Sequence, residues 1–240
     1  MYPTLLSLQN GLVVSCQTSA GNPIMGPDLM SLMALAAESG GAIGFRAEGS
    51  LDIAAIRAVS SLPIIGIRKT SRSAAGGVFI TPTYETAAEM AAAGADIIAL
   101  DGTSRPRPTG QTLADIVTRI HDELGLPVMA DTDSIDSGLY AQDAGADAIG
   151  TTLSGYTTDG AVPDVPDVDL VAALVKRLQQ PVIAEGRYWT RGDVTAAYSA
   201  GAFSVVVGSA ITNPMMITRR MVEVVPSSNR LNVPVRGSGA

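Results

Sequence analysis

The segment "AGADIIALDGT" (residues 93–103) contains the two signals that decide the fold of this chain. Gly94 is of the type that ends a helix, and an apolar run follows it almost directly. The same order of signals recurs in "GGAIGFRAEG" (40–49), "AGADAIGTTLS" (144–154) and "AGAFSVVVGSA" (200–210). Continuous apolar strands that follow helices are typical of a parallel sheet with both faces buried.

A second kind of strand start puts a proline before a short apolar run. It occurs in "SLPIIGIRKT" (61–70), "GLPVMADTDS" (125–134) and "QQPVIAEGRY" (179–188). Proline at the first position of a strand sacrifices no hydrogen bond that the sheet needs. With "GLVVSCQ" (11–17), the chain has eight predicted strands, and the proline and glycine kinds alternate from the second strand onward.

Amphipathic helical stretches lie between these strands, among them "DLMSLMALAAES" (28–39), "TYETAAEMAAA" (83–93), "LADIVTRIHDEL" (113–124) and "VDLVAALVKRL" (168–178). Eight β/α units in 240 residues predict an α/β protein with a single domain, a (β/α)8 TIM barrel over residues 1–225. The missing G-x-G-x-x-G turn argues against an open doubly wound sheet. Residues 226–240 have no periodicity and end in small residues, so we expect a flexible C-terminal tail.

The composition excludes several classes of protein. Hydrophobic residues make up 46% of the chain, yet no apolar run reaches the roughly 18 residues of a membrane span. A net charge of -7 leaves no broad positive surface for nucleic acid. The start, "MYPTLLSLQNGLVV" (1–14), lacks signal-peptide features, so we expect a cytoplasmic protein with no nucleic-acid or membrane partner. Cysteine and histidine each occur once, so we expect no metal site.

The site of such a barrel forms at the C-terminal ends of its strands. In order these ends carry Cys16 and Gln17, Arg46, Lys69, Asp101, Asp131, Thr152, Glu185, and Gly208 with Ser209. Charged residues at a barrel mouth also pair with one another for purely structural reasons, and for any single position both explanations hold equally. The combination of Lys69 with Glu185 favours function.

Lys69 is one of only two lysines, beside fourteen arginines. Arginine serves better as a plain positive charge, whereas only lysine supplies a titratable amine. The other, Lys176, lies near the C-terminus of a predicted helix, where cations are stabilised. Both burial and the neighbouring Arg46 would favour the neutral amine of Lys69, so we predict that it acts as a base.

A phosphate site is expected in the loops after the seventh and eighth strands, "EGRYWTRGD" (185–193) and "VGSAITNP" (207–214). Gly186 and Gly208 would let backbone N–H groups approach an anion, with Arg187 adding charge and Ser209 a hydroxyl. Glycines that only permit tight turns are the alternative.

Four other features give weaker support for a function. His121 is expected to be a solvated helix residue, and Cys16 a small core residue rather than a nucleophile. Asp133 fits a capping role as well as a supporting role at the site. The arginines of "TSRPRPTG" (103–110) would either lie at the opening of the barrel or be solvated.

Several of these segments together resemble the N-acetylmannosamine-6-phosphate 2-epimerase family. The resemblance is carried by "GLVVSCQ", "GGAIGFRAEGSLDI", "LPIIGIRK", "GADIIALDGTSRPRP", "MADTDS", "GADAIGTTLSGYT", "PVIAEGR" and "AGAFSVVVGSAIT", in this order, from about residue 9 to about residue 222. It implies a bacterial isomerase of sialic acid breakdown that interconverts N-acetylmannosamine 6-phosphate and N-acetylglucosamine 6-phosphate without a cofactor.

The resemblance also implies roles for particular residues. Lys69 and Glu185 match the family's catalytic lysine and glutamate, and Gln17, Arg46 and Asp131 match positions that line its substrate site. We add Thr152 and Tyr156 to the predicted substrate-binding residues. The chain departs from the family at Asn213, where an arginine is common, and in "TSAGNP" (18–23).

The chemistry of the implied reaction requires an acid–base pair. The C2 proton of a 2-acetamido sugar is acidic only when C1 is an open-chain aldehyde, so the ring must open before the proton is removed and returned. We assign the C2 proton to Lys69, assistance at the ring oxygen or the enolate to Glu185, and orientation of the substrate to Asp131. Alternatives are a sugar-phosphate enzyme that forms a Schiff base on Lys69, and a non-catalytic sugar-phosphate binder. We also expect a homodimer, for which residues 1–9 could supply an interface helix.

Overall fold

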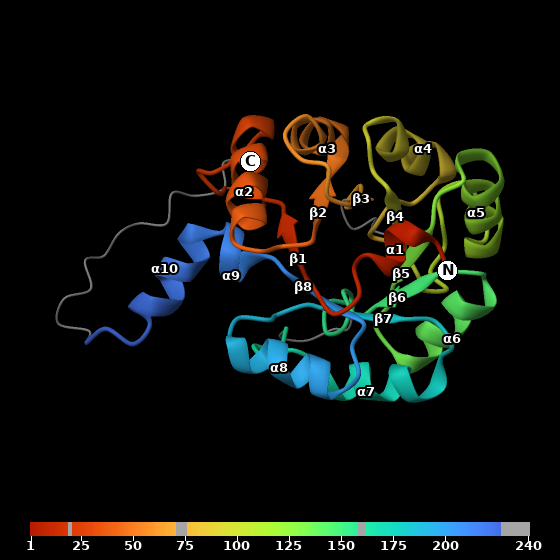
Figure 1. Cartoon of the computed structure of the whole chain (residues 1–240). Helices are drawn as coiled ribbons and strands as arrows, with labels where there is room; N and C mark the ends of the chain where they lie inside the picture. Colours follow the sequence, from red (N-terminus) through yellow and green to blue (C-terminus); the bar gives the residue numbers. More distant parts are fainter. Residues whose placement is uncertain (19–20, 71–75, 158–161, 227–240) are drawn as a thin grey trace.

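The computed structural model describes residues 1–18, 21–70, 76–157 and 162–226, and in these residues eight parallel strands close into a barrel (Figure 1). The strands follow one another in sequence order, and β8 pairs with β1. Their bounds are β1 Leu12–Cys16, β2 Gly44–Glu48, β3 Ile64–Ile67, β4 Ile97–Asp101, β5 Val128–Asp131, β6 Ala148–Gly150, β7 Val182–Glu185 and β8 Ser204–Val207. The predicted TIM barrel is confirmed.

Helices connect the strands and form a ring around the barrel (Figure 1). Their bounds are α1 Pro3–Leu6, α2 Pro27–Ser39, α3 Gly49–Arg57, α4 Tyr84–Ala92, α5 Leu113–Arg119, the π-helical turn η1 Ile120–Leu124, α6 Ile135–Asp143, α7 Val168–Arg177, α8 Arg191–Ser199, α9 Ser209–Thr212 and α10 Pro214–Val222. The four predicted helical stretches coincide with α2, α4, α5 with η1, and α7 to within a residue at each end. The predicted tail lies outside the described residues from residue 227 on. No helix of the described segments is long and apolar enough to cross a membrane.

Three helices begin with a reciprocal cap, which explains where they start. Thr112, Ser134 and Thr190 each accept a hydrogen bond from the backbone three residues ahead, and the side chain at that position bonds back. These caps satisfy N–H groups that the first helical turn leaves without partners. Each cap follows a loop at the C-terminal end of a strand, so the caps also hold the loops at the mouth.

Alternate residues of each strand point into the barrel, because side chains alternate between the two faces of a strand. The interior cluster contains Val13, Ile65, Ile97, Met129, Ile183 and Val206, all at most 1% exposed. Two residues further along the same faces come Ser15, Asp131 and Glu185. The interior therefore changes from apolar to polar along each of these strands.

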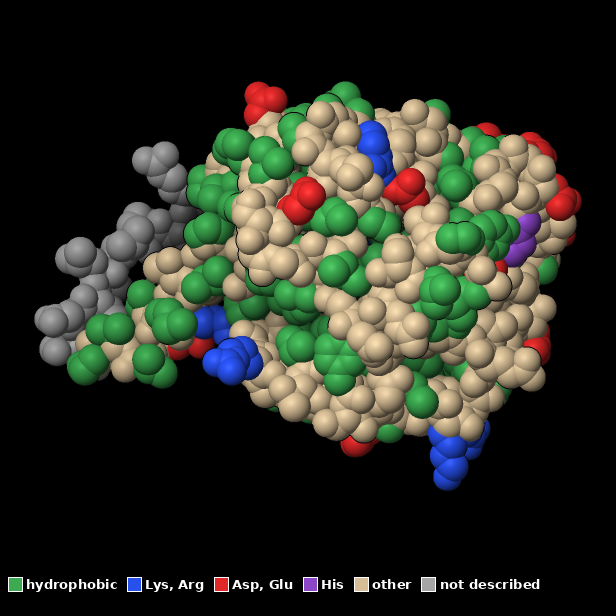
Figure 2. Space-filling view, viewed as in Figure 1, with side chains coloured by type: hydrophobic (Ala, Val, Ile, Leu, Met, Phe, Trp, Pro, Cys, Tyr) green, Lys and Arg blue, Asp and Glu red, His purple; other side chains and the backbone are tan. Residues whose placement is uncertain are grey.

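The N-terminal end of the barrel is closed by α1 and the residues after it. Leu5 and Leu8 are fully buried in the interior cluster, and a Cβ at Gly44 would lie 2.8 Å from the Leu8 side chain. Glycine at position 44 therefore makes room for Leu8. Figure 2 shows few charged side chains on the face that α1 crosses. Residues 1–9 thus use both leucines to fill the chain's own barrel, while Leu6 is 50% exposed, and an interface role for this segment stays a prediction.

His121 differs from the expected solvated residue. It lies in η1, with Nε2 2.8 Å from Oδ2 of Asp147 and its ring 6.0 Å from that of Tyr2. The side chain is 27% exposed. It joins η1 to the strand that begins after Asp147 and has no place at the C-terminal mouth.

Candidate active site

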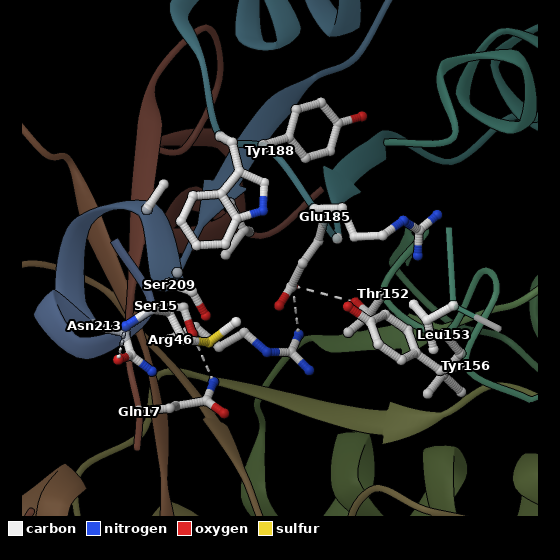
Figure 3. A pocket seen from close by; sticks show the side chains of 18 of the residues that line it. Ser15, Gln17, Arg46, Thr152, Leu153, Tyr156, Glu185, Tyr188, Ser209 and Asn213 are labelled. Atoms are coloured by element: carbon white, nitrogen blue, oxygen red, sulfur yellow. Dashed lines mark hydrogen bonds and ion pairs between the residues drawn. The ribbon is translucent and has the colours of Figure 1, made fainter. Parts of the chain in front are cut away.

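A cavity of about 670 Å³ lies at the C-terminal mouth of the barrel, a size typical of sites for small molecules. Ten of the eleven residues assigned to the site line it: Gln17, Arg46, Lys69, Thr152, Tyr156, Glu185, Gly186, Arg187, Gly208 and Ser209. Figure 3 shows that the labelled side chains, among them Gln17, Arg46 and Glu185, come from different parts of the barrel and converge on one space. The remaining one, Asp131, does not line the cavity.

Arg46 lies at the centre of a buried cluster on the cavity floor. Its guanidinium is 1% exposed and contacts Asp131 through two nitrogens, at 3.1 and 2.6 Å. Nη1 is also 3.1 Å from Oε2 of Glu185 (Figure 3). Burial disfavours the charged guanidinium, but the two carboxylates outweigh burial and raise the pKa of Arg46. Arg46 therefore stays charged and joins β2 to β5 and β7.

Glu185, at the end of β7, is a carboxylate that lines the cavity. Burial raises its pKa to about 7; Arg46 opposes this shift, and the negative charge of Asp131 adds to it. The Thr152 hydroxyl lies 3.2 Å from Oε2 of Glu185 and also contacts Oδ1 of Asp131. A carboxyl group with a pKa near 7 exchanges a proton readily at neutral pH, as general acid–base catalysis requires.

Lys69 lies two residues beyond β3 and differs from our expectation in its surroundings. Its side chain is 48% exposed, and Nζ forms an ion pair with Oε2 of Glu48 at 3.0 Å. The side chain is therefore not buried as expected, and its ion-pair partner is the carboxylate of Glu48. Lys69 still lines the cavity, and its charge acts on Glu185.

Two acidic residues at strand ends do not line the cavity and bond to other protein groups. Asp131 is fully buried against Arg46 and also accepts from the Thr152 hydroxyl, so it meets the cavity through these two residues. Asp101 is also fully buried and accepts hydrogen bonds from the backbone N–H of Phe79 at 2.8 Å and from Thr103. It thereby holds the loop after β3 against its own loop. Of the three carboxylates expected at the mouth, only Glu185 lines the cavity.

Cys16 also points away from the cavity. It is fully buried among the residues between the strands and the outer helices, and burial, with Asp52 nearby, raises the pKa of its thiol to about 12. Its neighbours Ser15 and Gln17 point inward, and Gln17 donates to the Ser15 hydroxyl at 2.9 Å (Figure 3). The expected core role of Cys16 is confirmed.

The predicted phosphate loops lie side by side at the cavity. Gly186 has φ +109°, a conformation that favours glycine, and Arg187 follows with φ +63°. The Arg187 guanidinium donates to the carbonyl oxygens of Val165, at 2.7 Å, and Ser154. Arg187 therefore fastens the segment after β6 as well as lining the cavity. Gly208 packs against Ser15, because a Cβ there would lie 3.3 Å from that side chain.

The loop after β4 has a structural role. Arg107 is buried and donates to the carbonyl oxygens of Thr81, Pro82 and Asp101. Arg105 pairs with Asp133 at 3.0 Å, and Asp133 also accepts from Thr157 at 2.7 Å. Neither arginine is simply solvated, and Asp133 joins three loops beside the cavity.

Sequence reasoning missed several cavity residues. Ser15 lies at a position whose alternation with Gln17 would have revealed it. Glu48, which lies two residues after Arg46, pairs with the cavity residue Lys69. Other residues that line the cavity without such a signal are Phe79, Ile80, Trp189, Met216 and Arg220. They lie in loops and in α10, where strand alternation predicts nothing.

The barrel and its mouth define the class of protein: a TIM barrel in which a lysine beyond β3 and a glutamate at the end of β7 line one cavity. The family described as "Putative N-acetylmannosamine-6-phosphate epimerase" matches residues 30–227. Two relatives named "Putative N-acetylmannosamine-6-phosphate 2-epimerase" come from Cutibacterium acnes and Caldanaerobacter subterraneus. The first is 47% identical over 89% of this chain and 93% of its own length. The second is 43% identical over 94% of this chain and 95% of its own length.

A solved structure agrees with these relatives. The N-acetylmannosamine-6-phosphate 2-epimerase from Clostridium perfringens is 39% identical, with a TM-score of 0.88 over 93% of this chain and 97% of its own. The chain belongs to the N-acetylmannosamine-6-phosphate epimerase family and is an isomerase. Thiamine phosphate pyrophosphorylase from Pyrococcus furiosus, 17% identical with a TM-score of 0.58, shares only the fold.

Proposed function

We propose that this protein interconverts N-acetylmannosamine 6-phosphate and N-acetylglucosamine 6-phosphate by proton transfer at C2, without a cofactor. A base removes the C2 proton of the open-chain aldehyde, and the electron pair of that C–H bond moves through C1 onto the carbonyl oxygen. Return of a proton to the opposite face of C2 restores the aldehyde as the epimer. The protein must therefore supply a base, an acid and a hold on the substrate.

The observation that carries this proposal is the position of Lys69 and Glu185 around one cavity. Lys69 follows β3 and Glu185 ends β7, and three strands separate β3 from β7 in either direction around the closed barrel. Groups on opposite sides of the mouth approach a bound sugar from different directions. Lys69 takes the C2 proton, and Glu185, with its pKa of about 7, serves the ring oxygen or the enolate oxygen.

The other cavity residues hold the substrate in this proposal. Gln17, Thr152 and Tyr156 present polar groups to the sugar, and Arg46 presents its charge from the floor with Asp131 behind it. The loops that contain Gly186, Arg187, Gly208 and Ser209 hold the phosphate end. The breakdown of sialic acid is the pathway in which this reaction has its place.

Proton NMR in heavy water tests the proposed reaction. With N-acetylmannosamine 6-phosphate as substrate, we expect N-acetylglucosamine 6-phosphate that carries deuterium at C2. The absence of both product and exchange, with folded protein, would reject the reaction. A shift in melting temperature on adding the sugar phosphate without turnover would then identify a binding protein.

A Schiff base on Lys69 is the alternative chemistry, which its accessibility at the mouth allows. Borohydride reduction in the presence of substrate would attach the sugar to Lys69 in that case. We expect no attachment, since a lysine that only transfers a proton forms no covalent bond to the substrate.

We also propose that the protein acts as a homodimer in the cytoplasm. No residue of α10 is buried. Met221 and Val222 at its end, and Val224 and Val225 just after it, are 40–84% exposed, an apolar surface that favours association. The phosphate charge of the substrate prevents its free passage through a bilayer, which supports a site inside the cell. Light scattering after size-exclusion chromatography tests the dimer, and cell fractionation tests the location.

A further inference from the structure

The cavity has four cationic side chains among its described lining residues: Arg46, Lys69, Arg187 and Arg220. A phosphate monoester carries close to two negative charges at neutral pH and is held best by guanidinium groups with N–H donors to spare. The partners that each cation already has therefore decide which of them is available for the phosphate.

Three of the four cations already have polar partners. Arg46 is enclosed by Asp131 and Glu185, and Lys69 pairs with Glu48 at 3.0 Å. Arg187 directs Nε and Nη1 to the carbonyl oxygens of Val165 and Ser154. Each of these side chains would have to give up or share a contact to hold an anion.

Arg220 differs from the other three because it contacts an aromatic ring. Its guanidinium carbon lies 4.4 Å from the centroid of the Trp189 ring, and within the described chain no carboxylate forms an ion pair with it. Stacking of this kind uses the face of the guanidinium and leaves the N–H groups at its edge free to donate. The contact orients the cation without neutralising it.

Trp189 is itself held in place at the start of α8. Its backbone N–H donates to Oδ2 of Asp193 at 2.9 Å, as does that of Thr190 at 2.8 Å. Burial would raise the pKa of Asp193, but these two hydrogen bonds and the charge of Arg220 lower it. Asp193 is therefore an anion that already serves two N–H groups near Arg220.

The helix α10 directs one face to the cavity. Asn213, Met216 and Arg220 all line it, and their spacing of three and four residues places them on a single side of a helix. Asn213 caps this helix, since its side chain accepts from the N–H of Met216 at 3.1 Å. The cap fixes the first turn of α10 and thereby the direction in which Arg220 extends.

From this arrangement we propose that Arg220, stacked on Trp189, binds the phosphate group of the substrate at the rim of the cavity. The proposal rests on the proposed function, because it names the group that recognises the phosphate of that same substrate. Arg220 acts together with the loops at Gly186 and Gly208, which line the same cavity. It makes α10, in addition to the barrel loops, part of the binding site.

The test compares Arg220→Gln with Arg219→Gln, its neighbour on α10 that does not line the cavity. We measure kcat and KM for N-acetylmannosamine 6-phosphate, and separately the affinity for inorganic phosphate by calorimetry. Arg220→Gln should raise both KM and the Kd for phosphate by about 10- to 100-fold, the loss of one charge-assisted contact, with kcat little changed. Arg220→Lys should recover part of the affinity, and Arg219→Gln should stay within about twofold of the parent, because its charge lies outside the cavity.

Equal KM and Kd in Arg220→Gln and the parent protein would overturn the proposal. A lower melting temperature as the sole effect would also overturn it, since the contact with Trp189 would then only hold α10 in place. Calorimetry with phosphate separates this proposal from the proposed function. If the parent protein binds phosphate through Arg220 but does not epimerise the sugar, the proposed reaction fails and the phosphate contact stands.

Discussion

The two ends of this barrel are built from the same eight strands and are used in opposite ways. At the N-terminal end, Leu5 and Leu8 close the interior against residues such as Ile65 and Ile97, all of them fully buried. At the C-terminal end, the inward positions carry Arg46 and Glu185 around an open cavity. In this fold, the N-terminal halves of the strands contribute to stability, and the residues at their C-terminal ends are left to face a substrate.

The ends also differ in their contribution to the free energy of unfolding. Full burial of a leucine side chain stabilises a fold by about 1.5–3 kcal/mol, so the apolar closure is favourable. The buried carboxyl of Glu185 acts in the other direction. Its pKa of about 7 in the folded protein lies above the ordinary value of 4.5, so the folded state holds a proton that the unfolded state releases. Stability therefore falls as the pH rises from about 4.5 to about 7.

Replacement of Lys69 is expected to give the largest effect at the mouth. Lys69→Ala should lower kcat by about a thousandfold or more, because the C2 proton loses its base. Lys69→Arg should be nearly as inactive, since a guanidinium does not give up its proton. The melting temperature should stay within about 2 °C, because the side chain is half exposed. The NMR exchange assay and thermal unfolding measure these effects.

Lys176→Ala is the matched control, because it removes the other lysine of the chain, which lies in the last turn of α7. It should retain full activity. Substantial activity in Lys69→Arg would show that this position supplies charge and does not transfer the proton.

Replacement of Leu8 is expected to show the opposite behaviour at the N-terminal end. Leu8→Ala should lower the free energy of unfolding by about 2–5 kcal/mol, because it opens a cavity in the barrel interior. The folded fraction at 25 °C should keep its kcat, since the reacting groups lie at the other end. Chemical denaturation and kinetics on the same samples measure both quantities.

Leu6→Ala serves as the control two residues earlier, at the end of α1, because Leu6 is 50% exposed. It should change the free energy of unfolding by less than about 0.5 kcal/mol. A large loss of kcat in folded Leu8→Ala would show that the two ends are coupled, and the separation proposed above would fail.

Replacement of Glu185 affects both activity and stability. Glu185→Gln should lower kcat by about a hundredfold and raise the free energy of unfolding at pH 8 by on the order of 1 kcal/mol, because no buried charge has to form. The gain should vanish below about pH 4.5, where Glu185 is protonated and uncharged in both the folded and the unfolded state. Urea unfolding at several pH values measures the window.

Glu85→Gln is the control for this pH dependence, because a hydrogen bond to its own backbone N–H and the Thr83 hydroxyl lower the pKa of the exposed Glu85. It should give no gain at pH 8. A pH-independent effect of Glu185→Gln would mean that the carboxyl does not titrate between pH 4.5 and 7.

Replacement of Glu48 is expected to give the smallest effect. Glu48→Gln removes the charge that pairs with Lys69 but keeps an oxygen acceptor, so kcat should fall by less than about tenfold with the melting temperature unchanged. Glu89→Gln, which removes the partner of Arg68 outside the cavity, should leave kcat unaltered. A hundredfold loss in Glu48→Gln would instead assign Glu48 a direct part in the chemistry.

Much of the fold and part of the site could be predicted because they depend on local patterns. Helix-ending glycines such as Gly94, strand-starting prolines and apolar runs act within a few residues of one another. Once eight β/α units are recognised, closure of the barrel brings the strand ends together. Arg46, Lys69 and Glu185 therefore appear at one mouth whatever the details of the loops.

The sequence by itself determined the order of the units, the barrel they form and the polar residues at its mouth, because each follows from periodicity along the chain. Only the tertiary structure decided which charges meet. Arg46 joins Asp131 to Glu185 across three strands, Lys69 pairs with Glu48, and Arg220 reaches Trp189 from a helix after the last strand. These contacts depend on distances between segments far apart in sequence, which local patterns do not contain.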